Sequence, residues 1–111
     1  MAEPLLTDVF GAGASQDATT ITISKASLVG LTPSASNTAE SLLAALLQTA
    51  QVSLSQANFN TNLDQSAIVA DGIVSIISRN DGTGTFLSYR QKQFNVTFAA
   101  VDTATFSPDD Y

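Results

Sequence analysis

Residues 68–101 decide the fold, and they read IVADGIVSIISRNDGTGTFLSYRQKQFNVTFAAV. β-branched residues dominate positions 68–78, as is typical of a strand, and the Asp71-Gly72 pair interrupts them as a turn or bulge. Residues 80–84 favour a hairpin turn, because Asn, Asp and Gly tolerate positive φ. A return strand follows over residues 85–101, and its second half alternates apolar with polar side chains. The stretch therefore predicts an antiparallel hairpin.

An amphipathic helix is the clearest signal before this hairpin. Asn37 and Glu40 have the spacing of a capping box, with Asn37 as the N-cap residue and Glu40 at N3. One apolar stripe follows at helical spacing and contains Leu42, Leu43, Leu46, Leu47 and Ala50. The pattern predicts a helix over residues 38–51, with an extension to Gln56 as the alternative. Its opposite face is small and uncharged, which indicates that this face is also covered.

Two further segments flank the helix. Residues 20–31 are expected to form a strand, since Ile21 and Ile23 alternate with hydroxyl-bearing residues. The alternation slips at residues 25–27, where a bulge or the strand end is expected. Residues 58–62 contain three asparagines and are expected to form a polar connector.

The order of these elements predicts an α+β fold, in which one amphipathic helix packs on a mainly antiparallel sheet. An all-β sheet with a small helical insertion is the alternative. We expect an N-terminal arm over residues 1–18, a single domain over 19–101 and an acidic C-terminal tail over 102–111. Both ends are expected to be extended arms.

The chain contains no histidine and no cysteine, and only four of its side chains are basic. Histidine is the side chain that titrates nearest neutral pH, and cysteine is the readiest nucleophile and soft metal ligand. We therefore predict a protein that is not an enzyme, with no catalytic residue, no cofactor and no metal site.

Three local patterns resemble functional sites, but each favours a structural interpretation. Residues 22–25 resemble an S-x-x-K motif, but they begin with Thr and lie in an expected strand rather than at a helix start. The carboxylates of residues 109–110 lie on a tail that cannot hold precise geometry. Residues 80–83 cluster oxygen ligands, but the spacing of a calcium loop is absent.

The formal net charge of −6 gives the chain no electrostatic reason to approach nucleic acid or an anionic membrane. No apolar run is long enough for a transmembrane helix, and the first residues lack the pattern of a signal peptide. We therefore expect neither a nucleic-acid nor a membrane partner, and synthesis in the cytoplasm.

Three groups of residues are candidates for contacts with other chains: an apolar N-terminal set, a basic hairpin and two aromatic residues of the tail. The hairpin carries three of the four basic side chains. Its charges are compatible with protection of sheet edges, with contact to an acidic tail of a neighbouring copy, or with nucleic acid. The candidate interface residues are Leu5, Leu6, Val9, Phe10, Arg79, Tyr89, Arg90, Lys92, Phe106 and Tyr111.

Ser, Thr, Asn and Gln make up 39 of the 111 residues, and only 13% are charged. Neutral polar side chains suit packing between chains, because they cost less to desolvate than charges do. In composition alone the chain is similar to small bacteriophage structural proteins. We therefore expect a homo-oligomeric assembly subunit, a capsid, cement or tail component of a virion, that also contacts other assembly proteins. The alternative is a small soluble module that presents its basic hairpin to a protein or carbohydrate ligand.

Overall fold

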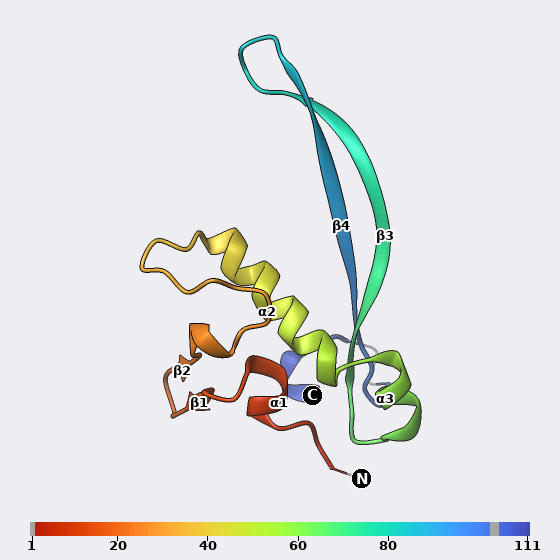
Figure 1. The fold of residues 1–111 in the computed structure, drawn as a ribbon. Helices are drawn as coiled ribbons and strands as arrows, with labels where there is room; N and C mark the ends of the chain where they lie inside the picture. The colour runs from red at the N-terminus through yellow and green to blue at the C-terminus, as the bar shows by residue number, and fades with distance from the viewer. Residues whose placement is uncertain (1, 103–104) are drawn as a thin grey trace.

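A long β-hairpin projects from a body of helices and short strands (Figure 1). The computed structural model describes residues 2–102 and 105–111. The described part contains two antiparallel sheets of two strands each, together with helices, so the predicted α+β class is confirmed. The elements are α1 (Leu6–Phe10), β1 (Ser15–Gln16), β2 (Ile21–Thr22), η1 (Lys25–Ser27), α2 (Ala39–Ser53), α3 (Gln56–Thr61), β3 (Ala67–Asn80), β4 (Phe86–Phe98) and η2 (Pro108–Asp110).

The hairpin of β3 and β4 confirms the prediction made from residues 68–101. Its register runs from Ala67 opposite Phe98 to Asn80 opposite Phe86, and it shifts between Asp71 and Val74. The predicted interruption at Asp71-Gly72 is therefore a bulge. The turn also lies where it was predicted. In that turn, the Asn80 Oδ1 atom accepts a hydrogen bond from the N–H of Gly82 at 2.9 Å, and Gly82 has a φ of 92°.

Helix α2 begins close to its predicted start, but its cap is different. Thr38 is the N-cap residue, and its Oγ1 atom accepts a hydrogen bond from the N–H of Ser41 at 3.1 Å. The assignment of Asn37 as the cap is therefore wrong. The Asn37 side chain closes the preceding loop instead, since its Oδ1 atom accepts from the N–H of Ser34 at 2.9 Å.

The predicted connector over residues 58–62 is also wrong, because most of it belongs to helix α3. Ser55 caps this helix by accepting a hydrogen bond from the N–H of Asn58 at 3.1 Å. The Asn58 amide in turn donates to the carbonyl of Ser53 at 3.0 Å. It thereby satisfies a carbonyl that the end of α2 leaves without a helical partner.

The strand predicted over residues 20–31 is reduced to two residues, Ile21–Thr22, which pair with β1. A 3-10 turn over Lys25–Ser27 follows, at the place where the alternation slips. The short β1–β2 hairpin is held by Asp17. Its Oδ1 atom accepts hydrogen bonds from the N–H groups of Thr19 at 2.9 Å and Thr20 at 2.8 Å.

The Asp17 carboxylate gives this short hairpin a pH dependence. Hydrogen bonds from the backbone N–H groups of Thr19 and then Thr20 lower the pKa of Asp17 from 3.8 to about 2. A carboxyl with a lowered folded-state pKa contributes stability above its unfolded pKa, and this contribution is lost as the pH falls through the folded pKa. We expect Asp17→Asn to lower Tm at neutral pH, and its deficit to shrink between about pH 4 and about pH 2.

Thermal melts of both proteins across this pH range measure the effect. Asp64→Asn is the matched control, because the Asp64 side chain accepts no hydrogen bond from the described residues. A Tm deficit of Asp17→Asn that stays constant down to about pH 2 would contradict the assignment.

The core lies where α2 meets the base of the hairpin. Ala50, Leu54 and Val69 are buried together, and Val9 and Phe94 pack against them. Helix α2 therefore covers the lower end of β3 and leaves the upper part of the hairpin free (Figure 1).

The most buried face of α2 differs from the predicted leucine stripe. Leu43 is 57% exposed, whereas Ala45 and Thr49 are buried. The Thr49 Oγ1 atom donates to the carbonyl of Ala45 at 2.7 Å and accepts from the N–H of Val29 at 2.9 Å. The small side chains of Ala45 and Thr49 let the loop at Val29 approach α2 closely. Part of the small, uncharged face of the helix is therefore covered, as expected.

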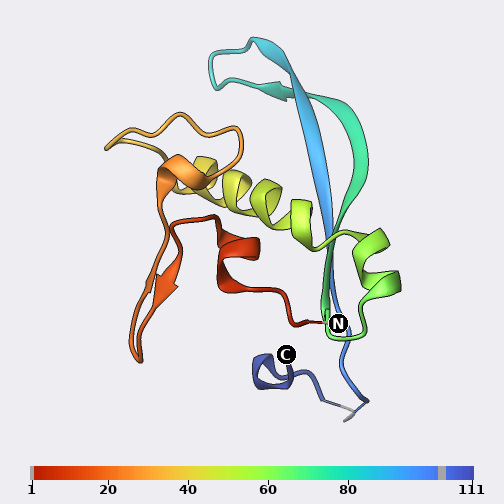
Figure 2. The same cartoon turned by 60° about the horizontal axis from the view of Figure 1, so that its bottom comes forward.

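Both ends of the described chain lie against the body. Helix α1 lies beside α2 (Figure 2), and a Cβ atom added at Gly11 would lie 2.9 Å from the Cβ of Ser27. At the other end, the rings of Phe98, Phe106 and Tyr111 contact one another, with centroids 5.3 to 6.0 Å apart. Residues 103–104 of the predicted tail lie outside the described residues.

Candidate functional site

The distal hairpin, residues 73–93, is the candidate functional site. Every residue in this segment is exposed, including those of both strands. Ile73 is 74% exposed, Ile76 is 66% exposed and Phe86 is 68% exposed. The other exposed large apolar side chains of the segment are Val74, Ile77, Leu87 and Tyr89. An accumulation of exposed apolar side chains of this kind marks sites of contact with other molecules.

Cross-strand pairing sorts these side chains onto two faces, because directly opposed residues point to the same side of a ribbon. We call them the Arg90 face and the Arg79 face. The Arg90 face consists of Val74, Ile76, Ser78, Asn80, Phe86, Ser88, Arg90 and Lys92. The Arg79 face consists of Ser75, Ile77, Arg79, Leu87, Tyr89 and Gln91. Each face therefore combines apolar and cationic side chains.

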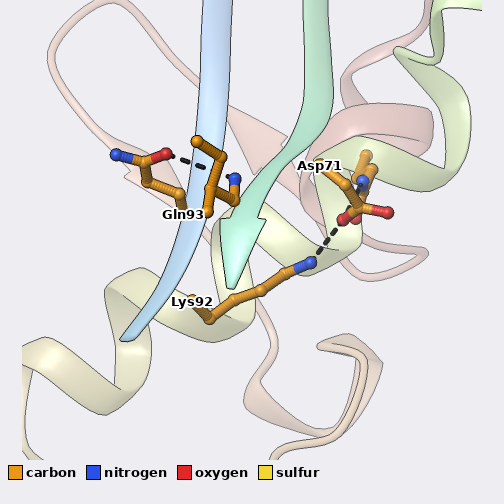
Figure 3. Close-up of polar contacts among 5 residues, drawn as sticks. Asp71, Lys92 and Gln93 are labelled. Carbon is orange, nitrogen blue, oxygen red and sulfur yellow. Dashed lines mark hydrogen bonds and ion pairs between the residues drawn. The ribbon is translucent and has the colours of Figure 1, made fainter. Parts of the chain in front are cut away.

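A polar cluster fixes the distal hairpin to the body at the bulge (Figure 3). The Asp71 carboxylate accepts hydrogen bonds from Lys92 Nζ at 2.6 Å and from Gln51 Nε2 at 2.9 Å. These contacts, the Gln51 hydrogen bond first and then Lys92, hold the pKa of Asp71 below its usual value. Since Gln51 lies in α2, the cluster joins the helix to both strands.

The bulge is completed by Gln93, whose Oε1 atom accepts a hydrogen bond from the N–H of Ile73 at 3.2 Å (Figure 3). Gly72 is required beside it, because an added Cβ would lie 2.6 Å from the Cβ of Gln93. The shifted register leaves the N–H of Ile73 without a backbone acceptor, and the Gln93 side chain takes the place of that acceptor.

The three cations of the distal hairpin have different surroundings. Lys92 is engaged by Asp71, and Arg79 lies over the ring of Tyr89 at 5.0 Å. The Arg90 side chain makes no hydrogen bond or ion pair with any described residue. Arg90 is therefore the basic side chain of the hairpin that is available to an acidic partner.

The structure places the predicted interface residues in three separate regions. Leu5, Leu6, Val9 and Phe10 lie in or beside α1, where Val9 packs against the core while Leu5 remains 63% exposed. Arg79, Tyr89, Arg90 and Lys92 lie together on the distal hairpin. Phe106 and Tyr111 lie with Phe98 in the C-terminal aromatic cluster.

Sequence reasoning missed the exposed apolar residues of the hairpin, namely Ile73, Val74, Ile76, Ile77, Phe86 and Leu87. The pattern predicts strands here, but it does not tell whether the apolar side chains of these strands are covered. Two adjacent apolar pairs, Ile73-Val74 and Ile76-Ile77, indicate that both faces of this strand are apolar, but they do not indicate that these faces are exposed. Adjacent residues of a strand point to opposite faces, so such pairs make both faces apolar.

Other kinds of site find little support in the described residues. They contain no group of three or more His, Cys, Asp or Glu side chains placed to hold a metal ion. None of the helices in residues 2–102 and 105–111 combines the length and apolar character needed to cross a membrane.

No protein family model, curated protein or solved structure matches this chain.

Proposed function

We propose that this chain is a non-enzymatic structural subunit of a symmetric homo-oligomer, and that the distal hairpin is its main contact with other copies. The observation that carries this proposal is the exposure of residues 73–93, with apolar side chains on both faces. A two-stranded ribbon without further cover is marginally stable in water. Contact with another chain would remove this apolar surface from water and stabilise the ribbon.

The composition supports the same proposal. Only 13% of the residues are charged, and hydroxyl and amide side chains are abundant. Such a surface can be covered by a neighbouring chain with a small desolvation cost. On this ground we propose a component of a virion, as part of a capsid, a cement layer or a tail, that is made in the cytoplasm and contacts further assembly proteins there.

Sedimentation velocity on the purified chain, at increasing concentration, tests the proposal. We expect species that are multiples of the 11.5 kDa chain and that grow with concentration. A strictly monomeric species at the highest concentration would overturn the assembly function.

The second candidate is a small binding module that presents the same hairpin to a protein or carbohydrate ligand. The exposed rings of Phe86 and Tyr89 favour it, because aromatic side chains are enriched in binding surfaces. A monomer in the sedimentation experiment would favour this candidate, whereas concentration-dependent assembly favours the first.

A further inference from the structure

We propose that the Arg90 face of one copy docks on the C-terminal aromatic surface of a second copy. We define this surface by Phe98, Phe106, Asp109 and Tyr111. The proposal rests on the assembly function and specifies its contact: a head-to-tail interface in which each copy offers its hairpin to one neighbour and its C-terminal surface to another.

Charge complementarity selects a second copy as the occupant. The distal hairpin carries three basic residues and one acidic residue, whereas the rest of the chain carries one basic residue and nine acidic residues. A positive hairpin is attracted to the acidic remainder of a neighbour, while two hairpins repel each other. The preferred contact therefore joins the hairpin to a different part of the next copy.

The C-terminal aromatic surface has the matching chemistry. Phe106 is 65% exposed and Tyr111 is 40% exposed, and a concavity in the surface lies between them and Phe98. Asp109 is exposed in η2, two residues before Tyr111 in the sequence. An apolar hairpin side chain can pack against the rings while Arg90 approaches the Asp109 carboxylate.

The Arg90 face has the complementary arrangement. Ile76 lies directly opposite Arg90 in the register, so an exposed apolar side chain and a cation without an ion pair stand next to each other. Phe86 lies further along the same face and is 68% exposed. On the other face, Arg79 is already stacked on Tyr89.

The shape of the molecule makes this contact intermolecular. In both ribbon views the hairpin turn lies at the top, away from the body, whereas the C-terminus lies at or below the body (Figures 1 and 2). The longest principal extent is 53 Å, against 33 and 26 Å for the others. A hairpin therefore meets the C-terminal surface of another copy, and two different surfaces in contact generate rings or filaments rather than isolated pairs.

A charge-swap experiment tests the contact. We expect Arg90→Glu and Asp109→Lys each to weaken self-association about tenfold, because each places like charges opposite one another. Mixing the two variants in equal amounts should restore assembly, since alternating copies then bring Glu opposite Lys and Arg opposite Asp at every contact. Sedimentation velocity of each variant, of the mixture and of the wild type measures the effect.

Two matched controls exclude a mere effect of net charge. Arg79→Glu makes the same charge change on the opposite face of the hairpin, and Asp64→Lys makes the change of Asp109→Lys on the body. Both should leave self-association close to that of the wild type.

The outcomes distinguish failure of the proposed hairpin-to-C-terminus contact from failure of the proposed assembly function. Assembly of the wild type together with full assembly of Asp109→Lys would overturn the contact alone and indicate pairing between hairpins. Failure of the mixture to assemble would overturn the contact in the same way. A wild-type chain that remains monomeric would overturn both the contact and the assembly function.

Discussion

Shortening the hairpin should abolish self-association and leave a folded monomer. The variant lacks residues 76–90 and joins Ser75 to Gln91 through Asn-Gly, a dipeptide that favours a tight turn. Ser75 and Gln91 are directly opposed in the register, so the remaining strands can keep their pairing. The core cluster lies at the hairpin base and stays complete, so we expect a cooperative thermal transition close to that of the wild-type chain.

The measurements are sedimentation velocity for assembly and circular dichroism for the thermal transition. The matched control replaces only residues 81–84 by Asn-Gly and keeps both strands at full length. This control should assemble like the wild type, because the two faces of the distal hairpin are retained. Undiminished assembly of the shortened variant would contradict a role of the hairpin as the main contact.

Val69→Asp should prevent folding altogether. Val69 is 3% exposed and joins Ala50 and Leu54 in the core cluster. An uncompensated charge at a buried position costs about 3–5 kcal/mol. A domain of this size has a total stability of about 5–15 kcal/mol. Because the core is small, we expect the wild-type chain to lie at the lower end of that range, so that the substitution leaves a stability near or below zero.

Urea denaturation followed by circular dichroism measures this effect. Val74→Asp is the control, since it makes the same substitution in the same strand at a position that is 48% exposed. We expect this control to keep a cooperative unfolding transition. A Val69→Asp variant with a normal transition would show that the core does not lie at the base of the hairpin.

Signals carried by neighbouring residues were sufficient to predict much of the fold. The turn at residues 80–84 and the bulge at Asp71-Gly72 depend on residues that tolerate unusual backbone geometry, so the sequence alone identifies them. The body of α2 follows from its helical spacing. The predicted N-cap residue was wrong by one position, because Asn and Thr are both good N-cap residues. Asn37 contacts the preceding loop instead, so Thr38 caps the helix.

Features that depend on distant contacts were not predictable in this way. Residues 20–31 have a strand-like pattern, but the fold supplies a partner strand for only two of them. Leu43 was expected to be buried, whereas the close approach of the residue 29 loop turned Thr49 inward. For the candidate site, the pattern predicted the strands and their cations, but nothing in it indicated that the body stops at the base of the hairpin.

The core has a consequence for the order in which the chain is made. Its members come from widely separated positions, since Val9 is synthesised early and Phe94 late. The ribosome must release most of the chain before the last of these side chains can join the others. A chain interrupted before Phe86 has neither a complete core nor a second strand for its hairpin. Under the proposed assembly function, we therefore expect such unfinished chains to be left out of the oligomer, because they lack the hairpin that is proposed to join complete copies.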